Sequence, residues 1–492
     1  MISASRSFLV AMTAAATLSA VSASRLFAQA ALDRTLEPTP MAPKPLHVPT
    51  WTHTTLANGA ELVVTPKRDL PLVSFTINFV GGASQFEPAS KAGLSALTTA
   101  MMREGTISRT GDQLSDALEL LGVGIGVNVG SESGAISFGS TKAKLAPTLD
   151  VLMDMLLHPS FPNDALERLR GQTIVNLTQS KDQPPVIAGN VFARVLYGTD
   201  HPYGRVQTEE SVRSITRDDV VAFHKAYFQP GRAIVTVTGD VDAAAVKTVI
   251  EKAFAAWPQG GEKPTFAYPA VPPKAATTIY LVDKPKAAQS VFAIGLVGPP
   301  RDNPDYFALQ VMNTILGGIF QSRLQHNIRE EKGYSYGVNS RFAYGKGPGA
   351  FRGGGSMTTA KTDSALIEFM KELRGVQGEK PFTDDELAQG KAALAQSLPS
   401  DFASVNATSN AVAALYLQSL PQDYYQTFAA KVNAVTKDDL VRVAKKYIDL
   451  DHLDIIIVGD RAVIEEPLRQ TRIAPIVRLD IDGKPLPVAV TP

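Results

Sequence analysis

The chain of 492 residues contains no cysteine, and this absence excludes disulfide bonds and the attachment of a lipid to a cysteine. Net charge is absent as well, because 48 basic residues balance 48 acidic ones. Nothing in this balance favours nucleic acid or an anionic membrane surface as a partner. With 44% hydrophobic and 20% charged residues, the composition is that of a globular chain long enough for two or more domains, held together by packing alone.

Local metal and nucleotide motifs are also lacking. No two of the seven histidines lie three to five positions apart, as two zinc ligands on one helix would: His47, His53, His158, His201, His224, His326 and His452. The glycine-rich stretch 353–356 lacks the lysine and the spacing of a P-loop, and the stretch 122–130 does not complete a G-x-G-x-x-G motif. The sequence therefore predicts no local metal motif and gives no support to nucleotide binding.

Long apolar runs are confined to the N-terminus. Arg6 precedes an alanine-rich apolar run at 8–23, and Ala28-Gln29-Ala30 is an A-x-A cleavage signal. These features predict a signal peptide over residues 1–30. The alternative is an uncleaved membrane anchor, which the short run rich in Ser, Thr and Ala disfavours. We expect a periplasmic protein with no membrane span after cleavage, beginning with a proline-rich arm at 31–50.

One unit of sequence occurs twice, at 216–240 and at 436–460. In each copy a threonine followed by acidic residues predicts a helix start, and a β-branched run before Gly-Asp predicts a buried strand. The interval from the threonine to the closing aspartate is identical, so the repetition predicts a duplicated domain. The proline-rich stretch 260–275 between the copies is typical of a linker. We therefore expect domains at 51–259 and 276–466, followed by a tail at 467–492.

Periodicity and turn residues predict the elements of each domain. Asn58-Gly59 is typical of a hairpin turn within the stretch 54–65. Further strands are expected at 72–80, 124–129, 134–141, 277–282 and 290–297, and helices near 112–121, 147–157, 163–181 and 304–316.

The stretch Gly93-Leu-Ser-Ala-Leu-Thr-Thr-Ala-Met-Met-Arg-Glu-Gly-Thr106 has small and apolar residues that suit a helix packed closely on a sheet. It resembles the zinc helix of the M16 peptidase family (insulinase, pitrilysin, mitochondrial processing peptidase), which contains Gly-Leu-Ala-His-Phe-Leu-Glu-His-Met. The resemblance places the two ligand histidines on Ala96 and Ala100 and the catalytic glutamate on Thr99. A methyl group cannot bind zinc, which needs imidazole, thiolate or carboxylate donors.

The remaining zinc positions of the family are replaced too. The helical pattern at 166–177 resembles the helix that carries the third ligand, a glutamate, and this position aligns with Asn176. A second acid, one turn earlier, aligns with Leu169. The resemblance thus implies that this chain binds no metal and no other cofactor of its own.

The second half resembles the family more closely. The stretches 313–324 and 328–336 are similar to the signature of the M16 C-terminal domain, in which an arginine and a tyrosine seven positions later face the zinc site from the opposite lobe. These residues are Arg329 and Tyr336 here. A guanidinium and a phenol can hold a substrate carbonyl and the oxyanion that develops on it. The alternative is that Arg329 belongs to a surface Arg-Glu-Glu-Lys ion-pair cluster and Tyr336 to the core of a strand.

Two glycine motifs in this half have more than one interpretation. Gly317 and Gly318 are either a glycine-rich loop that admits a peptide backbone or the end of a helix. The stretch 333–337 matches the G-x-S-x-G elbow of serine hydrolases, with Ser335 as nucleophile and His452 as the one downstream base. Its setting, after a charged helical segment rather than a strand, disfavours this reading.

The resemblance spans roughly residues 50 to 466 and implies an α+β fold of two homologous M16-type domains, each a sheet covered by helices, joined by a linker and enclosing a chamber. It also implies the function of a half-site or non-catalytic subunit in a two-subunit bacterial zinc metallopeptidase. The partner, in a heterodimer or larger assembly, would be a zinc-bearing M16 homologue, and the substrate a peptide. The alternative is a peptide-binding or envelope scaffold protein with no hydrolytic role.

Overall fold

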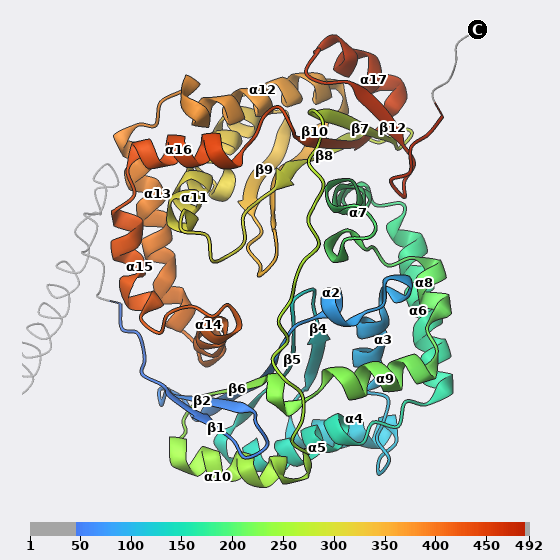
Figure 1. Cartoon of the computed structure of the whole chain (residues 1–492), viewed down its shortest axis with the longest axis vertical. Helices are drawn as coiled ribbons and strands as arrows, with labels where there is room; N and C mark the ends of the chain where they lie inside the picture. Colours follow the sequence, from blue (N-terminus) through green and yellow to red (C-terminus); the bar gives the residue numbers. More distant parts are fainter. Residues whose placement is uncertain (1–45, 488–492) are drawn as a thin grey trace, which may run out of the picture. The chain divides into compact units, whose positions relative to one another are not determined.

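The structure, a computed structural model, describes residues 46–487. The signal peptide expected at 1–30 and most of the arm expected at 31–50 lie outside this range. The described residues form two six-stranded sheets, each with its own large hydrophobic core (Figure 1). No helix in this part of the chain has the length and apolar character needed to cross a bilayer.

The first sheet has the strand order β1-β2-β6-β3-β5-β4. Only β2 and β6 pair in parallel. The expected turn at Asn58-Gly59 joins β1 to β2, with Gly59 at φ +92° and the Asn58 side chain accepting from the amide of Ala60 at 3.1 Å. The strands are β1 (Thr52–Thr55), β2 (Glu61–Pro66), β3 (Leu72–Val80), β4 (Gly126–Val129), β5 (Ser133–Thr141) and β6 (Ala233–Gly239).

The helices of the first half include all those expected from the sequence, together with four that the pattern did not indicate, α2, α7, α8 and α10. They are α2 (Ala83–Phe86), α3 (Leu94–Met101), α4 (Gly111–Leu121), α5 (Leu145–Leu157), α6 (Asn163–Ser180), α7 (Pro184–Tyr197), α8 (Glu209–Ser214), α9 (Arg217–Tyr227) and α10 (Ala243–Ala253).

The second sheet repeats this plan with the order β12-β7-β11-β8-β10-β9. The tail contributes to it, because α17 crosses the boundary expected at 466 and β12 then pairs in parallel with β7. The strands are β7 (Thr278–Asp283), β8 (Gln289–Val297), β9 (Ser335–Phe342), β10 (Ala350–Thr358), β11 (Asp454–Gly459) and β12 (Ile476–Leu479).

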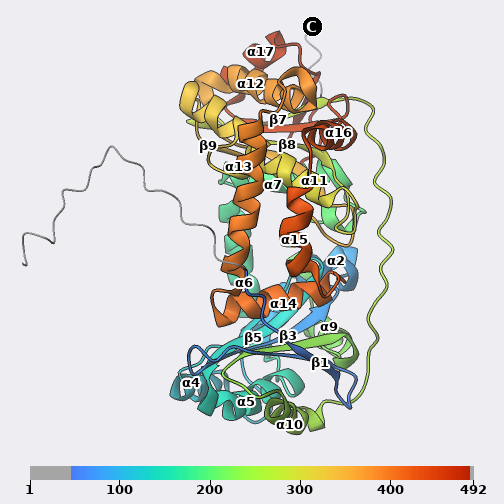
Figure 2. The same ribbon diagram turned by 90° about the vertical axis from the view of Figure 1, so that its left-hand side faces the viewer.

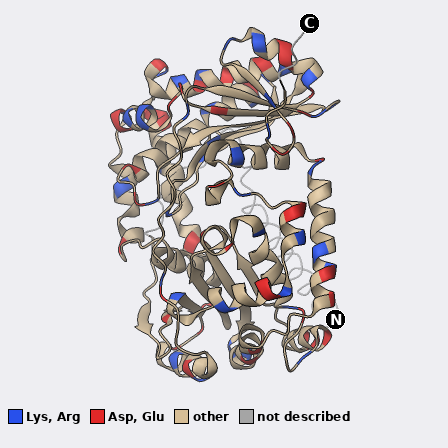
Figure 3. Ribbon diagram, turned by 45° about the vertical axis from the view of Figure 1, so that its right-hand side comes forward, with Lys and Arg blue, Asp and Glu red and all other residues tan. Residues whose placement is uncertain are grey.

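The helices of the second half are α11 (Tyr306–Asn313), α12 (Thr362–Arg374), α13 (Asp384–Ser397), α14 (Val405–Leu417), α15 (Tyr424–Asn433), α16 (Lys437–Tyr447) and α17 (Arg461–Gln470). Two π-helical segments, the wide turns Thr314–Gly318 and Gln325–Glu331, follow α11. Charged residues of both signs are scattered over these elements rather than gathered on one of them (Figure 3).

The duplicated unit forms the same structure twice, and the expectation of two homologous α+β domains is confirmed. The hydroxyls of Thr216 and Thr436 each accept from the third amide of their helix, at 3.2 Å in both copies. The strands that follow, β6 and β11, are buried along their whole length. Between the halves, residues 261–275 contain no helix or strand and form an extended connection from α10 to β7 (Figure 2). The enclosed chamber stays a prediction.

One helix of each half packs on the sheet of the other half. Helix α7 of the first half packs on β8 and β11, and α14 of the second half packs on β3 and β6 (Figure 1). This exchange explains why β3 is buried on both faces. Its odd-numbered apolar residues point into the first core, while Thr76 and Asn78 lie on the α14 side, where Thr236 and Ser409 share a hydrogen bond of 3.1 Å.

Candidate functional site

The residues that the family resemblance placed at the zinc ligands meet in one cavity of about 670 Å³. Ala96 and Ala100 come from α3, Asn176 and Leu169 from α6, and α7 closes a further side. Because these positions are far apart in sequence, their convergence supports the register that the resemblance gave. We call this cavity, lined by Ala96, Ala100, Leu169 and Asn176, the degenerate zinc cavity.

The side chains of this cavity do not fit a zinc ion. Its polar lining consists of amide, hydroxyl and guanidinium groups, and none of the zinc donors imidazole, thiolate or carboxylate is among them: Gln172, Thr173, Asn176, Ser180, Asn190, Arg205 and Gln207. The base position is also occupied otherwise, since Thr99 is 7% exposed and its hydroxyl donates to the carbonyl of Ala96 at 3.0 Å. In residues 46–487 no group of three or more His, Cys, Asp or Glu side chains is placed to hold a metal.

Packing and capping explain why α3 is still a helix. Leu94, Leu97 and Met101 are buried in the first core. The carboxylate of Glu87 accepts from the amides of Gly93 at 3.1 Å and Ser95 at 2.6 Å, which satisfies amide groups that the first turn leaves free. The apolar face of α3 thus packs in the core, while Ala96 and Ala100 present only methyl groups to the cavity.

Arg329 lies in the wide turn Gln325–Glu331 and is half-buried, with its guanidinium carbon 4.4 Å from the centroid of the Phe320 ring. Its neighbours Glu330 and Glu331 pair with His326 instead, each at 3.1 Å. Within the described residues no carboxylate lies within 4 Å of the Arg329 guanidinium. The expected alternative of an Arg-Glu-Glu-Lys ion-pair cluster is therefore not what the structure shows.

Tyr336 stands on β9, the edge strand of the second sheet, and its side chain is 88% exposed. The alternative that Tyr336 is a core aromatic is thus wrong. The alternation of the strand is interrupted here. Ser335 and Val338 are three positions apart and both buried, because the pairing of β9 with β10 shifts register between Gly355 and Met357, and Tyr336 faces out. Both candidate residues are accessible to a ligand or a partner.

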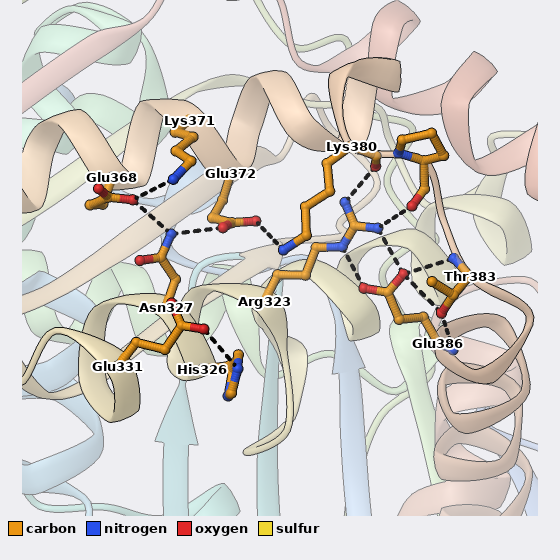
Figure 4. Close-up of polar contacts among 11 residues, drawn as sticks. Arg323, His326, Asn327, Glu331, Glu368, Lys371, Glu372, Lys380, Thr383 and Glu386 are labelled. Atoms are coloured by element: carbon orange, nitrogen blue, oxygen red, sulfur yellow. Dashed lines mark hydrogen bonds and ion pairs between the residues drawn. The ribbon is translucent and has the colours of Figure 1, made fainter.

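The segment that carries Arg329 is fixed by buried polar contacts (Figure 4). Arg323 binds Glu386 through two hydrogen bonds of 2.7 and 2.8 Å and also donates to the carbonyls of Lys380 and Pro381. Burial by itself raises the pKa of Glu386, but the hydrogen bonds from Arg323 and from the Thr383 amide, together with the charges of Arg323 and Lys380, outweigh it and lower the pKa below its usual value.

Asn327 adds a second anchor, donating to Glu372 at 2.7 Å and to Glu368 at 2.9 Å (Figure 4). Sequence reasoning missed these supporting residues. Arg323 belongs to the Ser-Arg-Leu part of the signature, but its partners lie 57 to 63 residues further along the chain and carry no local signal.

Gly317 and Gly318 end the helical turn that follows α11. A Cβ atom on Gly317 would lie 2.5 Å from the backbone nitrogen of Ser340, so only glycine allows β9 to approach this closely. Gly318 is exposed, and its use in admitting a peptide backbone stays a prediction.

The serine-hydrolase alternative is wrong. Ser335 is 8% exposed, and its hydroxyl donates to the carbonyls of Ser356 at 2.7 Å and Gly337 at 3.0 Å. His452, the one downstream base, pairs with Asp449 at 2.7 Å on the loop between α16 and β11. A nucleophile needs both access to the substrate and a neighbouring base.

Comparison with known proteins agrees with this geometry. The family model "Insulinase (Peptidase family M16)" matches residues 71–201, and the model "Peptidase M16 inactive domain" matches residues 214–394. The chain is 28% identical to an uncharacterized zinc protease of Mycobacterium leprae, over 58% of this chain and 64% of that protein's length. It is 24% identical to the non-peptidase homolog YmxG of Helicobacter pylori, over 80% of this chain and 90% of the relative.

A solved structure shares the fold. The crystal structure of a peptidase M16 inactive domain from Pseudomonas fluorescens superimposes with a TM-score of 0.75 at 26% identity, covering 83% of this chain and 98% of that one. The sequence matches cover both halves, and the solved structure covers most of the chain. The chain therefore belongs to peptidase family M16, and the cavity where the resemblance places the zinc ligands is lined by no imidazole, thiolate or carboxylate.

Proposed function

We propose that this chain is a non-catalytic subunit of a periplasmic zinc metallopeptidase and completes the active site of a zinc-bearing M16 partner. The observation that supports this most directly is the contrast between the two candidate sites. The first half has no zinc donors in its cavity, whereas Arg329 and Tyr336 of the second half are accessible and carry no competing ion pair in the described structure. The name of the Helicobacter pylori relative, a non-peptidase homolog, is consistent with this role.

In such a complex the partner would supply the zinc ion, its bound water and the glutamate base. The task of this chain would be to hold the peptide. Arg329 has five N–H donors in a fixed plane, and with no carboxylate taking them it can donate to the carbonyl of the bond to be cut. The Tyr336 hydroxyl is a second donor. Both would bind the oxyanion more strongly than the carbonyl, because negative charge develops on that oxygen.

The test compares the isolated chain with the chain mixed with its partner, purified together from the periplasm. The isolated chain should contain no zinc and cleave no peptide, and the mixture should cleave. Arg329→Ala should lower kcat/KM of the mixture by about 10²-fold or more, as the loss of an oxyanion donor does. Arg472→Gln, on an exposed arginine after α17, is the matched control.

Full activity of the complex with Arg329→Ala and Tyr336→Phe together would exclude this role. The location is tested separately by cell fractionation with an antibody against the chain. Recovery in the cytoplasm at full length would contradict the signal peptide and the periplasmic part of the proposal.

A second candidate is a scaffold that binds peptides without hydrolysis. The degenerate zinc cavity favours it in one respect, because its amide side chains can pair with peptide groups. A neighbouring gene for an M16 protein with an intact His-x-x-Glu-His motif would favour the subunit. If peptides bind the chain but no zinc protein co-purifies and no mixture cleaves them, the scaffold is the better description.

A further inference from the structure

A second cavity, of about 380 Å³, lies where α7 of the first half meets the hairpin of β9 and β10. Two arginines line it, Arg341 on β9 and Arg352 on β10, together with Phe192 and Gly189 of α7. This cavity plays no part in the zinc positions or in the Arg329 and Tyr336 pair. Its lining is aromatic and glycine-rich, with positive charge on one side.

The two arginines are direct cross-strand partners in the pairing of β9 with β10. Opposite residues on neighbouring strands point to the same face, and two like charges at such a pair destabilise the sheet. No carboxylate within the described range lies within 4 Å of either guanidinium. The Arg352 guanidinium is half-buried, 5.3 Å from the Phe192 ring, and its pKa is lowered by burial and then by the charge of Arg341. The fold thus maintains two adjacent cations without a counter-charge.

Glu132 is the one acidic residue of the cavity lining, and its oxygens are already used. They accept from the hydroxyls of Tyr203 and Tyr268, the latter at 2.9 Å, and from the backbone amides of Lys346 at 3.0 Å and Gly347 at 3.2 Å. This carboxylate fastens the tip of the hairpin to the first half. It leaves the two arginines free to bind another anion.

The cavity adjoins the degenerate zinc cavity. Ala193 of α7 lines both of them. A third hollow shares Arg205 and Gln207 with the degenerate zinc cavity and Tyr203 with the arginine cavity. An extended chain rises about 3.3 Å per residue, so a peptide of a few residues can reach from one cavity to the next.

We propose that Arg341 and Arg352 bind the carboxylate of a peptide, with the peptide chain running toward the degenerate zinc cavity. The proposal rests on the proposed function in so far as the ligand is a peptide. Two guanidinium groups side by side match the two oxygens of a carboxylate, and the apolar lining accommodates the residue that bears it. The carboxylate is either the C-terminus of the peptide or the side chain of an aspartate or glutamate.

The test measures binding of fluorescently labelled ten-residue peptides to the full chain without a partner. Three peptides of one sequence are compared: a free C-terminal acid, the C-terminal amide, and the amide with one internal glutamate. The free acid should bind about 10-fold or more tightly than the amide, as one charge-assisted contact provides. Comparable tightening by the internal glutamate would assign the site to acidic side chains as well.

The double variant Arg341→Gln, Arg352→Gln should bind the acid and the amide equally, with the affinity for the amide unchanged. Arg352→Lys should restore part of the difference, because it returns the charge without the planar fork. Arg472→Gln should keep the full difference. Circular dichroism of the double variant verifies its fold, and Arg341→Gln alone should raise the midpoint of thermal unfolding slightly, since it removes a like-charge pair.

The proposal fails if the unaltered chain binds the acid and the amide equally, if it binds neither, or if the double variant keeps the difference. These outcomes are independent of hydrolysis. A complex that fails to cleave, or that is unaffected by Arg329→Ala, overturns the subunit role and leaves the carboxylate site standing.

Discussion

In the first half, α3 turns Leu94, Leu97 and Met101 into its core and presents Ala96 and Ala100 to the cavity. In the second half, the corresponding layer of helical turns is anchored by Arg323 and presents Arg329. The structural faces of the two halves are equally complete. The halves differ in the side chains that these elements leave uncovered, methyl groups of Ala96 and Ala100 in one and the guanidinium of Arg329 in the other. The comparison teaches that packing fixes a helix in place whether or not its exposed side retains chemistry.

The two sheets also differ in how each packs against the helix that comes from the other half. Helix α7 packs on the second sheet through a sizeable apolar cluster that includes Val191, Ala293 and Ile456. Helix α14 packs on the first sheet through a small cluster around Val412 and Ile234, supplemented by the hydrogen bond between Thr236 and Ser409. Apolar burial therefore contributes more at the α7 junction than at the α14 junction.

The largest expected effect comes from removing the chemical difference between the halves. Ala96→His, Thr99→Glu, Ala100→His and Asn176→Glu together return the family's donors to one cavity. Zinc affinity should rise by about 10³-fold or more, because imidazole and carboxylate ligands replace methyl and amide groups. Metal analysis after dialysis measures it. The same variant without Asn176→Glu is the control, and equal zinc in both would show that these positions do not form the site.

The two copies of the repeat should differ in how their contribution to stability depends on pH, because α9 carries His224 where α16 carries Ala444. Burial lowers the pKa of His224 to about 4, although its hydrogen bond to the Leu156 carbonyl opposes the shift. In the unfolded chain this histidine binds a proton near pH 6.5, whereas in the folded chain it stays neutral until about pH 4. The free energy of unfolding should therefore be highest above pH 6.5 and should fall by roughly 3 kcal/mol by pH 4.

Urea unfolding of the unaltered chain and of His224→Gln at a series of pH values tests this. The amide keeps a donor for Leu156 but does not titrate in this range. Parallel loss of stability in both proteins below pH 6.5 would assign the pH dependence to other groups.

Truncation of one valine at each junction tests the exchange of helices. Val191→Ala and Val412→Ala each remove two buried methyl groups, and each should lower the free energy of unfolding by about 2 kcal/mol. The loss should be larger for Val191, whose surroundings are more extensively apolar. Urea unfolding of both variants gives the comparison, and a larger loss at Val412 would contradict the ranking.

The smallest effect concerns Tyr227 and Tyr447, the last residues of the two repeated helices α9 and α16. Tyr227→Phe leaves the buried carbonyl of Gly81 without its 2.7 Å hydrogen bond and should lower stability by about 1 to 2 kcal/mol. Tyr447→Phe should lower it by less than about 1 kcal/mol, because Asp305 retains Arg442 and Lys446 as donors. Equal losses in urea unfolding would show that the two copies do not differ in this way.

Much of the fold could be predicted from sequence because its signals are local. The Asn58-Gly59 turn, the capped helices at Thr216 and Thr436 and the β-branched strands after them all follow from short patterns. Helix α7 was missed, since it is bounded by Pro184 and packs on a sheet formed much later in the chain. The register of Ala96, Ala100 and Asn176 came from family resemblance, not from any local donor pattern.

The sequence by itself determined the duplication, the identity of most strands and the absence of a local zinc motif, because capping, side-chain alternation and motif spacing depend on residue type and short intervals. Only the tertiary structure decided that one helix of each half packs on the sheet of the other half, that Tyr336 is exposed, and that Arg341 and Arg352 share one cavity. These are properties of contacts between residues far apart in the chain, whose free energy depends on what surrounds them rather than on what precedes them.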